Sequence, residues 1–398
     1  MTCHPGAVSC HPERMRGILP GNGSSPAGKI PRSLRSLGMT ASLRSLGMTA
    51  VLVLAPAPLT AQLYVPNQDD ATVSVIDPAT RRLLRTVDLR RYGVGDNAKP
   101  HHVQVEPDGS AWYVTLIGAG KVLKLDRTDR VLGSADMEVP GLIALHPRRD
   151  LMFVGRSMSA VNPPQTMAVI RRSDMTLLDE VNLLFPRPHG IVVHPGGEVV
   201  YVASLGTNQI ATVGVEQGEV RLLDVPGMPH GFVQAAVSPD GGLLAVTAEL
   251  NDSLLVFDVS EPTSPKLARG ISMPDGPFEP AFTADGSTIF VTALNANRVA
   301  AVDTRDWTAT VLPEHPGFGQ PHGIALSPDG SRVFVGNRHQ AGGVHDHTGG
   351  RPTAPGTVMA ICVASRTVDT VLRVGHYAAG LGMTPARTGT ATAGRPCP

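Results

Sequence analysis

Short apolar runs rich in Val, Leu, Ile and Thr alternate with polar segments from about residue 63 to about residue 385. Residues 332–335 form one such run, and residues 357–363 and 368–374 form the next two. The runs are too short for helices, and their residue types favour strands. The segments between them contain turn sequences such as Pro-Asp-Gly and Asn-Asp-Ser. The pattern therefore predicts an all-β chain.

A longer phrase repeats along the same region: Pro-His-Gly, an apolar stretch, Pro-Asp-Gly and then a β-rich run. The clearest copy spans residues 321–335, and weaker copies begin at Pro100, Pro188 and Pro229. The turn that follows each apolar stretch is marked by Pro107, Pro147, Pro195, Pro239, Ala284, Pro328 and Pro385, in steps of 40, 48, 44, 45, 44 and 57 residues. Four short strands in each step of this length are typical of a β-propeller blade.

The two ends of the repeating region complement each other. Residues 63–67 match the second strand of a blade, whereas residues 380–385 match a first strand with no blade after it. We therefore predict a seven-bladed β-propeller in residues 62–386, closed by pairing of the C-terminal strand with the N-terminal blade. Such closure removes the free sheet edges that would otherwise pair with other chains.

Residues 73–87, which read VSVIDPATRRLLRTV, resemble the hairpin between the third and fourth strands of YVTN-repeat β-propellers, the YncE-like family. Residues 201–204 and 290–293 are similar to the second strand of that repeat. The resemblance extends from residue 63 to about residue 385 and implies the propeller fold. It leaves the activity open, because the superfamily includes lactonases, lyases, haem and copper domains, and binding proteins.

Residues 1–61 precede the repeats and have the features of a leader. Residues 33–41 are repeated without change as residues 42–50, which is typical of a translated nucleotide repeat, so we expect the true start at Met39 or Met48. Arg44, the apolar residues 46–59 and a small-residue site before residue 62 then resemble an export signal that is too short to span a membrane. We expect a periplasmic or secreted protein with no membrane span after signal removal.

Composition narrows the possible partners. Removal of residues 1–61 leaves 28 basic and 33 acidic residues, and this mildly acidic balance argues against nucleic acid. We expect a monomer that binds a small molecule or a protein at the channel mouth. Cys362 lies in an alternating strand and is interpreted as a small buried residue, and Cys397 lies in a tail, residues 387–398, that we expect to be disordered. No Cys-x-x-Cys-His sequence is present, which excludes covalent c-type haem.

The histidines of the repeats occupy equivalent places. In propellers the first strands line the central channel, so Pro-His-Gly at their starts should direct side chains to one mouth. In the sixth blade Glu279 takes the place of the histidine, and Arg156 and Arg338 stand at ends of second strands. The ligand-binding candidates are His101, His102, His189, His230, His322, His376, Glu279, Arg156 and Arg338. The arginines would hold a carboxylate or phosphate by paired hydrogen bonds, or form ion pairs with Glu249 or Glu279.

An insertion at residues 338–356 falls between the second and third strands of the seventh blade, over the same mouth. Imidazole and carboxylate are ligands that Cu(II) and Zn(II) prefer, so a copper or zinc site is a hypothesis. Its candidate ligands are His189, His230, His322, His376, His345 and His347. In the alternative interpretation each ring histidine bonds to the backbone of a neighbouring blade, and the insertion is simply solvated. His146, His194 and His315 fall in outer turns, where we expect surface or turn residues.

No Gly-x-Ser-x-Gly, Ser-x-x-Lys, Walker or dinucleotide-binding sequence is present, so the chain carries no motif of a known reaction. Three functions remain. We favour an exported, non-catalytic binding propeller that uses the histidine-lined mouth. The alternatives are an enzyme of lactonase or lyase type, with a histidine as general base and an arginine stabilising negative charge, and a metal-dependent redox or storage protein.

Overall fold

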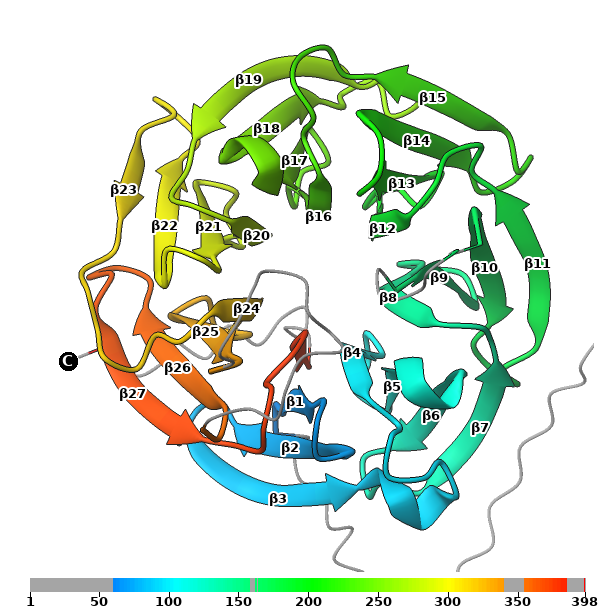
Figure 1. Cartoon of the computed structure of the whole chain (residues 1–398), viewed down its shortest axis with the longest axis vertical. Helices are drawn as coiled ribbons and strands as arrows, with labels where there is room; N and C mark the ends of the chain where they lie inside the picture. Colours follow the sequence, from blue (N-terminus) through cyan, green and yellow to red (C-terminus); the bar gives the residue numbers. More distant parts are fainter. Residues whose placement is uncertain (1–59, 158–161, 163, 340–353, 385–396, 398) are drawn as a thin grey trace, which may run out of the picture. The chain divides into compact units, whose positions relative to one another are not determined.

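The computed structural model describes residues 60–157, 162, 164–339, 354–384 and 397. The chain divides into two units, Met1–Pro56 and Ala57–Pro398, and the first of these lies outside the described residues. The second unit contains seven four-stranded antiparallel sheets placed around a common centre (Figure 1). The predicted all-β, seven-bladed propeller is therefore confirmed. No helix in the described ranges is long and apolar enough to cross a membrane.

The first four sheets follow one another along the chain. The first contains β28 (Gly382–Met383), β1 (Leu63–Asn67), β2 (Thr72–Asp77) and β3 (Arg82–Asp88). The second contains β4 (Pro100–Val105), β5 (Ala111–Leu116), β6 (Lys121–Asp126) and β7 (Val131–Asp136). The third contains β8 (Pro140–Leu145), β9 (Leu151–Arg156), β10 (Thr166–Arg171) and β11 (Leu177–Asn182). The fourth contains β12 (Pro188–Val193), β13 (Val199–Ser204), β14 (Gln209–Gly214) and β15 (Val220–Asp224).

The last three sheets repeat the same order. The fifth contains β16 (Phe232–Val237), β17 (Leu243–Ala248), β18 (Ser253–Asp258) and β19 (Lys266–Ser272). The sixth contains β20 (Pro277–Phe282), β21 (Thr288–Ala293), β22 (Arg298–Asp303) and β23 (Ala309–Val311). The seventh contains β24 (Pro321–Leu326), β25 (Arg332–Asn337), β26 (Thr357–Cys362) and β27 (Val368–Arg373). Three short 3₁₀ helices, η1 (Leu89–Tyr92), η2 (Ile117–Ala119) and η3 (Glu249–Asn251), follow strands or connect them.

The first sheet combines strands from distant parts of the sequence. The two-residue strand β28 pairs antiparallel with β1, with Leu63 opposite Met383 and Tyr64 opposite Gly382. Just before β28, the amide of Gly380 donates to the carbonyl of His101, 2.9 Å away in the second sheet. The inner edge of the first sheet is therefore a short strand, and a backbone hydrogen bond ties the segment before it to the next blade.

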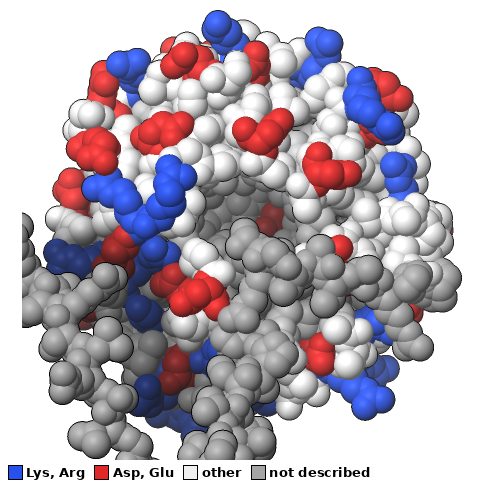
Figure 2. Space-filling model, turned by 180° about the vertical axis from the view of Figure 1, so that it is seen from behind, with Lys and Arg blue, Asp and Glu red and all other residues white. Residues whose placement is uncertain are grey.

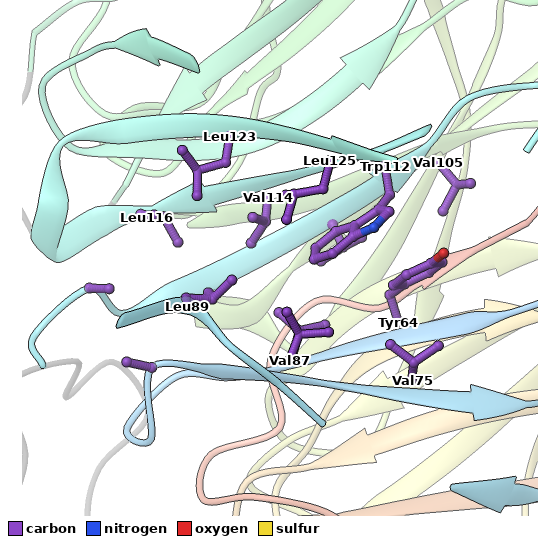
Figure 3. Packing of buried hydrophobic residues seen from close by; sticks show 14 residues of the cluster. Tyr64, Val75, Val87, Leu89, Val105, Trp112, Val114, Leu116, Leu123 and Leu125 are labelled. Atoms are coloured by element: carbon purple, nitrogen blue, oxygen red, sulfur yellow. The ribbon is translucent and has the colours of Figure 1, made fainter. Parts of the chain in front are cut away.

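Apolar side chains fill the spaces between neighbouring sheets. Between the first and second sheets Tyr64 stacks on Trp112, with ring centroids 4.9 Å apart and planes at 28° (Figure 3). Val75, Val87 and Val114 pack around this pair, and all five side chains are buried. Stacked aromatic rings bury a large apolar area, so this contact stabilises the association of the first two blades.

The histidines in two outer turns join neighbouring blades. Nε2 of His146 bonds to the carbonyl of Gly197, 2.9 Å away in the fourth sheet's first turn, and its Nδ1 accepts from the amide of Arg149. Nε2 of His194 makes the corresponding bond, 3.0 Å, to the carbonyl of Gly241. Both histidines lie in turns, as expected, but they are buried and not at the surface. Nε2 of each ring bonds to the following blade, and Nδ1 accepts from backbone amides of its own turn.

A disulfide joins Cys362, the last residue of β26, to Cys397. Cys362 is buried, as the sequence predicted, but it is also bonded to Cys397, which the sequence analysis did not predict. The sequence gives no sign of this pairing, because the two cysteines are 35 positions apart and no periodic pattern relates them. Apart from Cys397, the tail that we expected to be disordered lies outside the described residues.

We expect reduction of this disulfide, or Cys362→Ser, to lower the free energy of unfolding by about 4 kcal/mol, since the bond closes a long loop in the unfolded chain. Chemical denaturation with and without dithiothreitol measures the change. Cys397→Ser is the matched control: it removes the same bond without altering a buried strand residue, and reductant should then have no further effect. An unfolding curve of the native protein that reductant leaves unchanged would contradict the pairing.

Candidate functional site

In the second to seventh blades, the first strand begins with a register irregularity against the second strand. In β4, β20 and β24 the register with the second strand shifts between the first and fourth residues of the strand. The second residue of these strands is His101, Phe278 or His322, and the third is His102, Glu279 or Gly323. We refer to these places as the second and third positions of the inner strands.

The second position brings two predicted histidines together. The rings of His101 in the second blade and His322 in the seventh blade are 5.8 Å apart between centroids and edge to face. They meet because the first blade, which lies between them, contributes only the short segment around β28 at the channel. His322 also contacts the rings of Phe278 and Tyr377, at 4.2 and 6.2 Å. We call the set His101, His322, Phe278, Tyr377, Arg338 and Gln68 the mouth cluster.

Arg338 supplies the positive charge of the mouth cluster. It follows β25, its side chain is fully buried, and its Nη1 donates to the hydroxyl of Tyr377 at 2.8 Å. Its guanidinium carbon also lies 5.0 Å from the centre of the Tyr377 ring. Burial raises the pKa of Tyr377, so the phenol stays neutral beside the guanidinium. Arg338 thus places a buried cation beside a neutral phenol, with the carboxylate of Asp69 near enough to act on both groups.

Gln68 joins the two sides of the mouth cluster, and the ion pair of Asp69 with Lys99 lies next to it. Nδ1 of His101 lies 2.9 Å from Oε1 of Gln68, and the amide of Gln68 donates to the carbonyl of Tyr377. The neighbouring carboxylate of Asp69 lies 3.9 Å from Nζ of Lys99. Burial raises the pKa of Asp69, while Lys99 lowers it.

Glu279 stands at the third position of β20. Its amide donates to Oγ1 of Thr292 at 2.9 Å, and the same hydroxyl donates to the carbonyl of His322 at 3.1 Å. Burial raises the pKa of Glu279 to about 8, although a hydrogen bond from the amide of Ile324 acts in the opposite direction. The carboxyl group is therefore mostly neutral at pH 7 and can donate a hydrogen bond.

His102 and His189 bond to the backbone of the next blade, as the alternative interpretation expected. Nδ1 of His102 accepts from the amide of Ile143 at 3.1 Å, and burial lowers the pKa of His102 to about 4. Nδ1 of His189 donates to the carbonyl of Val233, 2.5 Å away. Both rings hold inner strands together, and whether they also bind a ligand stays a prediction.

The structure does not bring three other candidates into the mouth cluster. His230 stacks on Phe232 and bonds to the carbonyl of Pro226, and His376 pairs with the carboxylate of Asp70 at 3.0 Å. Arg156 forms an ion pair at 2.6 Å with Glu180 on the outermost strand of its blade. This partner is neither of the two glutamates that we considered. Each of these side chains has a local partner that directs it away from the cluster.

Within the ranges that the structure describes, no three His, Cys, Asp or Glu side chains lie close enough together to hold a metal ion. His345 and His347, with most of the insertion, lie outside the described residues. The copper or zinc site stays a prediction, and it would need ligands from that insertion.

The sequence did not reveal Tyr377, Gln68 or a pocket beside His376. The pocket has a volume of about 420 Å³ and is lined by Asp69, Asp70, Asp96 and Arg90 among others. Figure 2, which views the molecule from behind Figure 1, shows a hollow near the centre with acidic atoms visible inside it. Tyr377 and Gln68 lie outside the repeated phrase, so only the folded chain places them beside the histidines.

No protein-family model matches the chain, and no curated protein matches it in sequence. The YVTN resemblance is therefore not confirmed at the level of the family. Solved structures with the same fold include a functionally unknown protein from Desulfotomaculum acetoxidans, with a TM-score of 0.64 and 13% identity over 82% of this chain and 99% of that one. They also include a periplasmic gluconolactonase from Pseudomonas aeruginosa, with a TM-score of 0.64 and 18% identity over the same shares.

A streptogramin B lyase is similar as well, with a TM-score of 0.57 and 14% identity over 72% of this chain and 87% of that chain. At these identities the likeness shows the propeller fold alone. The functional argument therefore depends on the side chains of this chain.

The lowered pKa of His102 predicts a loss of stability in acid. His102 takes up a proton near pH 6.5 in the unfolded chain but only near pH 4 in the folded chain. The contribution of its neutral form to the free energy of unfolding is therefore complete above pH 6.5 and decreases toward pH 4. We expect roughly 3 kcal/mol to be lost across that interval.

His102→Gln keeps an acceptor for the Ile143 amide. In urea unfolding, its free energy of unfolding should decrease between pH 7 and pH 4 by roughly 3 kcal/mol less than that of the native protein. His315→Gln, in the connection between β23 and β24, should retain the native decrease in the free energy of unfolding. Equal falls in His102→Gln and the native protein would contradict the assignment.

Proposed function

We propose that this chain is an exported propeller that binds a small carboxylate-bearing molecule at the mouth cluster. The proposal depends on one observation: the rings of His101 and His322 lie 5.8 Å apart beside a guanidinium that is bonded to Tyr377 at 2.8 Å. Groups from the first, second and seventh blades converge there, although His101 lies more than two hundred residues before His322, Arg338 and Tyr377 in sequence.

The donors of the mouth cluster suit a carboxylate better than a cation. Arg338 is positively charged at any physiological pH, and imidazole and phenol groups donate hydrogen bonds to oxygen. Hydrogen bonds to an ionised carboxylate are shorter and stronger than those between neutral groups. Phe278 and Tyr377 supply apolar ring surface against the carbon atoms of such a ligand.

Two features support export. Residues 46–59 have the length and polarity of a signal-peptide core, and Cys362 pairs with Cys397. Disulfides persist in the periplasm and outside the cell, whereas cytosolic thiols are kept reduced. We therefore propose a periplasmic or secreted location.

An enzyme of lactonase or lyase type is the second candidate. Neutral Glu279 and His322 lie on adjacent inner strands and would provide a general acid and a general base. Solved propellers of the same fold include a gluconolactonase and a streptogramin B lyase, which fits this candidate loosely. Hydrolysis of glucono-lactone by the native protein, absent in His322→Ala, would favour the enzyme.

We expect acetate and gluconate to bind the native protein and to bind His101→Ala and His322→Ala at least about tenfold more weakly, because each variant loses a hydrogen bond worth about 1.5 kcal/mol or more to a charged group. Isothermal titration calorimetry at pH 7 measures the affinities, and circular dichroism checks the fold. His315→Ala is the matched control and should bind like the native protein. Failure of the native protein to bind either carboxylate, or an equal loss in His315→Ala, would contradict the proposal.

A further inference from the structure

The third position of the inner strands points at the following blade and leaves little room. A Cβ atom on Gly323 would lie 2.3 Å from the carbonyl oxygen of Ala379, and one on Gly380 would lie 2.6 Å from Cδ2 of His102. Glycine is required at both places because the next inner strand approaches so closely. In the sixth blade the same position carries the much larger side chain of Glu279.

The carboxyl group of Glu279 is only half satisfied. It accepts the amide hydrogen of Ile324 on β24, which accounts for one oxygen. The other oxygen, Oε2, is buried and makes no hydrogen bond within the described part of the chain. The residue as a whole keeps some accessible surface. A buried polar oxygen without a partner is costly, so such an atom indicates a missing partner.

The elements packed against Glu279 place one other titratable group near it. β24 carries His322, two residues before Ile324. β16, β17 and β21 carry no Asp, Glu, His, Lys or Arg. Glu279 therefore has no lysine or arginine on these strands to neutralise a negative charge, and His322 links it to the mouth cluster through Phe278 and Thr292.

We propose that Glu279 donates a hydrogen bond from Oε2 to a carboxylate bound at the channel mouth, and that it thereby selects ligands with a hydrogen-bond-accepting oxygen. This inference rests on the proposed function, because it assumes that the mouth cluster holds the ligand. The neutral acid keeps its proton on Oε2 and shares it in an O–H···O⁻ bond, and no covalent bond changes. Such charge-assisted bonds are among the strongest that uncharged side chains make.

The direction in which carboxylate binding changes with pH follows from the proposal that Glu279 acts in its neutral form. Glu279 carries its proton below about pH 8 and loses it above that value, and an ionised Glu279 would repel a carboxylate. Binding should therefore be full at pH 6 to 7 and should weaken by up to about tenfold for each pH unit above 8.

The test uses acetate, the smallest ligand with the required group, in calorimetric titrations of the full-length protein at pH 6.5, 7.5, 8.5 and 9.5. Glu279→Gln keeps the shape and donates through its amide at every pH. Glu279→Leu removes the donor. At pH 6.5 we expect the affinity of Glu279→Gln for acetate to be within about threefold of that of the native protein. Glu279→Leu should bind acetate roughly tenfold to a hundredfold more weakly than the native protein. Only the native protein should lose affinity between pH 7.5 and 9.5.

The outcomes separate this inference from the proposed function. If Glu279→Leu binds acetate like the native protein while His322→Ala does not, the mouth cluster binds the carboxylate and the role of Glu279 is wrong. If Glu279→Gln loses affinity with pH as the native protein does, another group titrates and the inference is again wrong. If the native protein does not bind acetate at any pH, both proposals fail. Thermal unfolding of each variant checks that lost binding is not lost folding.

Discussion

The close approach of the inner strands around the channel is the constraint on which the structure depends. Neighbouring first strands lie so near each other that Gly323 and Gly380 have no space for a Cβ atom. Polar side chains at equivalent places must then bond to the next blade, as His102 does with the amide of Ile143. The same geometry makes these groups neutral, because burial disfavours both an imidazolium and a carboxylate. The close packing of the inner strands therefore also keeps buried groups such as His102 and Glu279 in their neutral forms.

The same constraint explains why the repeat does not yield a symmetrical ring of ligands. Seven similar blades would present seven similar side chains, yet each histidine is directed by its own neighbours. His189 bonds to the carbonyl of Val233, His230 to that of Pro226, and His376 to Asp70. Among the histidines that the structure describes, the rings of His101 and His322 contact each other, because the first blade contributes so short a strand between them. The short inner strand of the first blade thus lets polar rings from the second and seventh blades meet.

The mouth cluster combines a positive charge with neutral donors in a buried setting. Arg338 and Tyr377 form a bonded pair, and Glu279 on the neighbouring blade is mostly uncharged at pH 7. In water such groups would interact weakly with a single carboxylate, but low dielectric strengthens each hydrogen bond. A propeller offers this setting without a dedicated binding domain, which is consistent with the many activities that its fold supports.

The sequence by itself determined the number of blades, the length of the strands and the places where the phrase Pro-His-Gly enters the inner strands. These are local properties, since a period near 44 residues and short apolar runs need no knowledge of distant contacts. It also singled out His101, His322, Glu279 and Arg338. Only the tertiary structure decided which of the candidates meet, that Arg156 turns outward to Glu180, and that Cys397 returns to Cys362. The direction of a side chain and its bonding partner depend on residues that are far apart in the chain. A repeat pattern in the sequence does not show which of these distant residues come into contact.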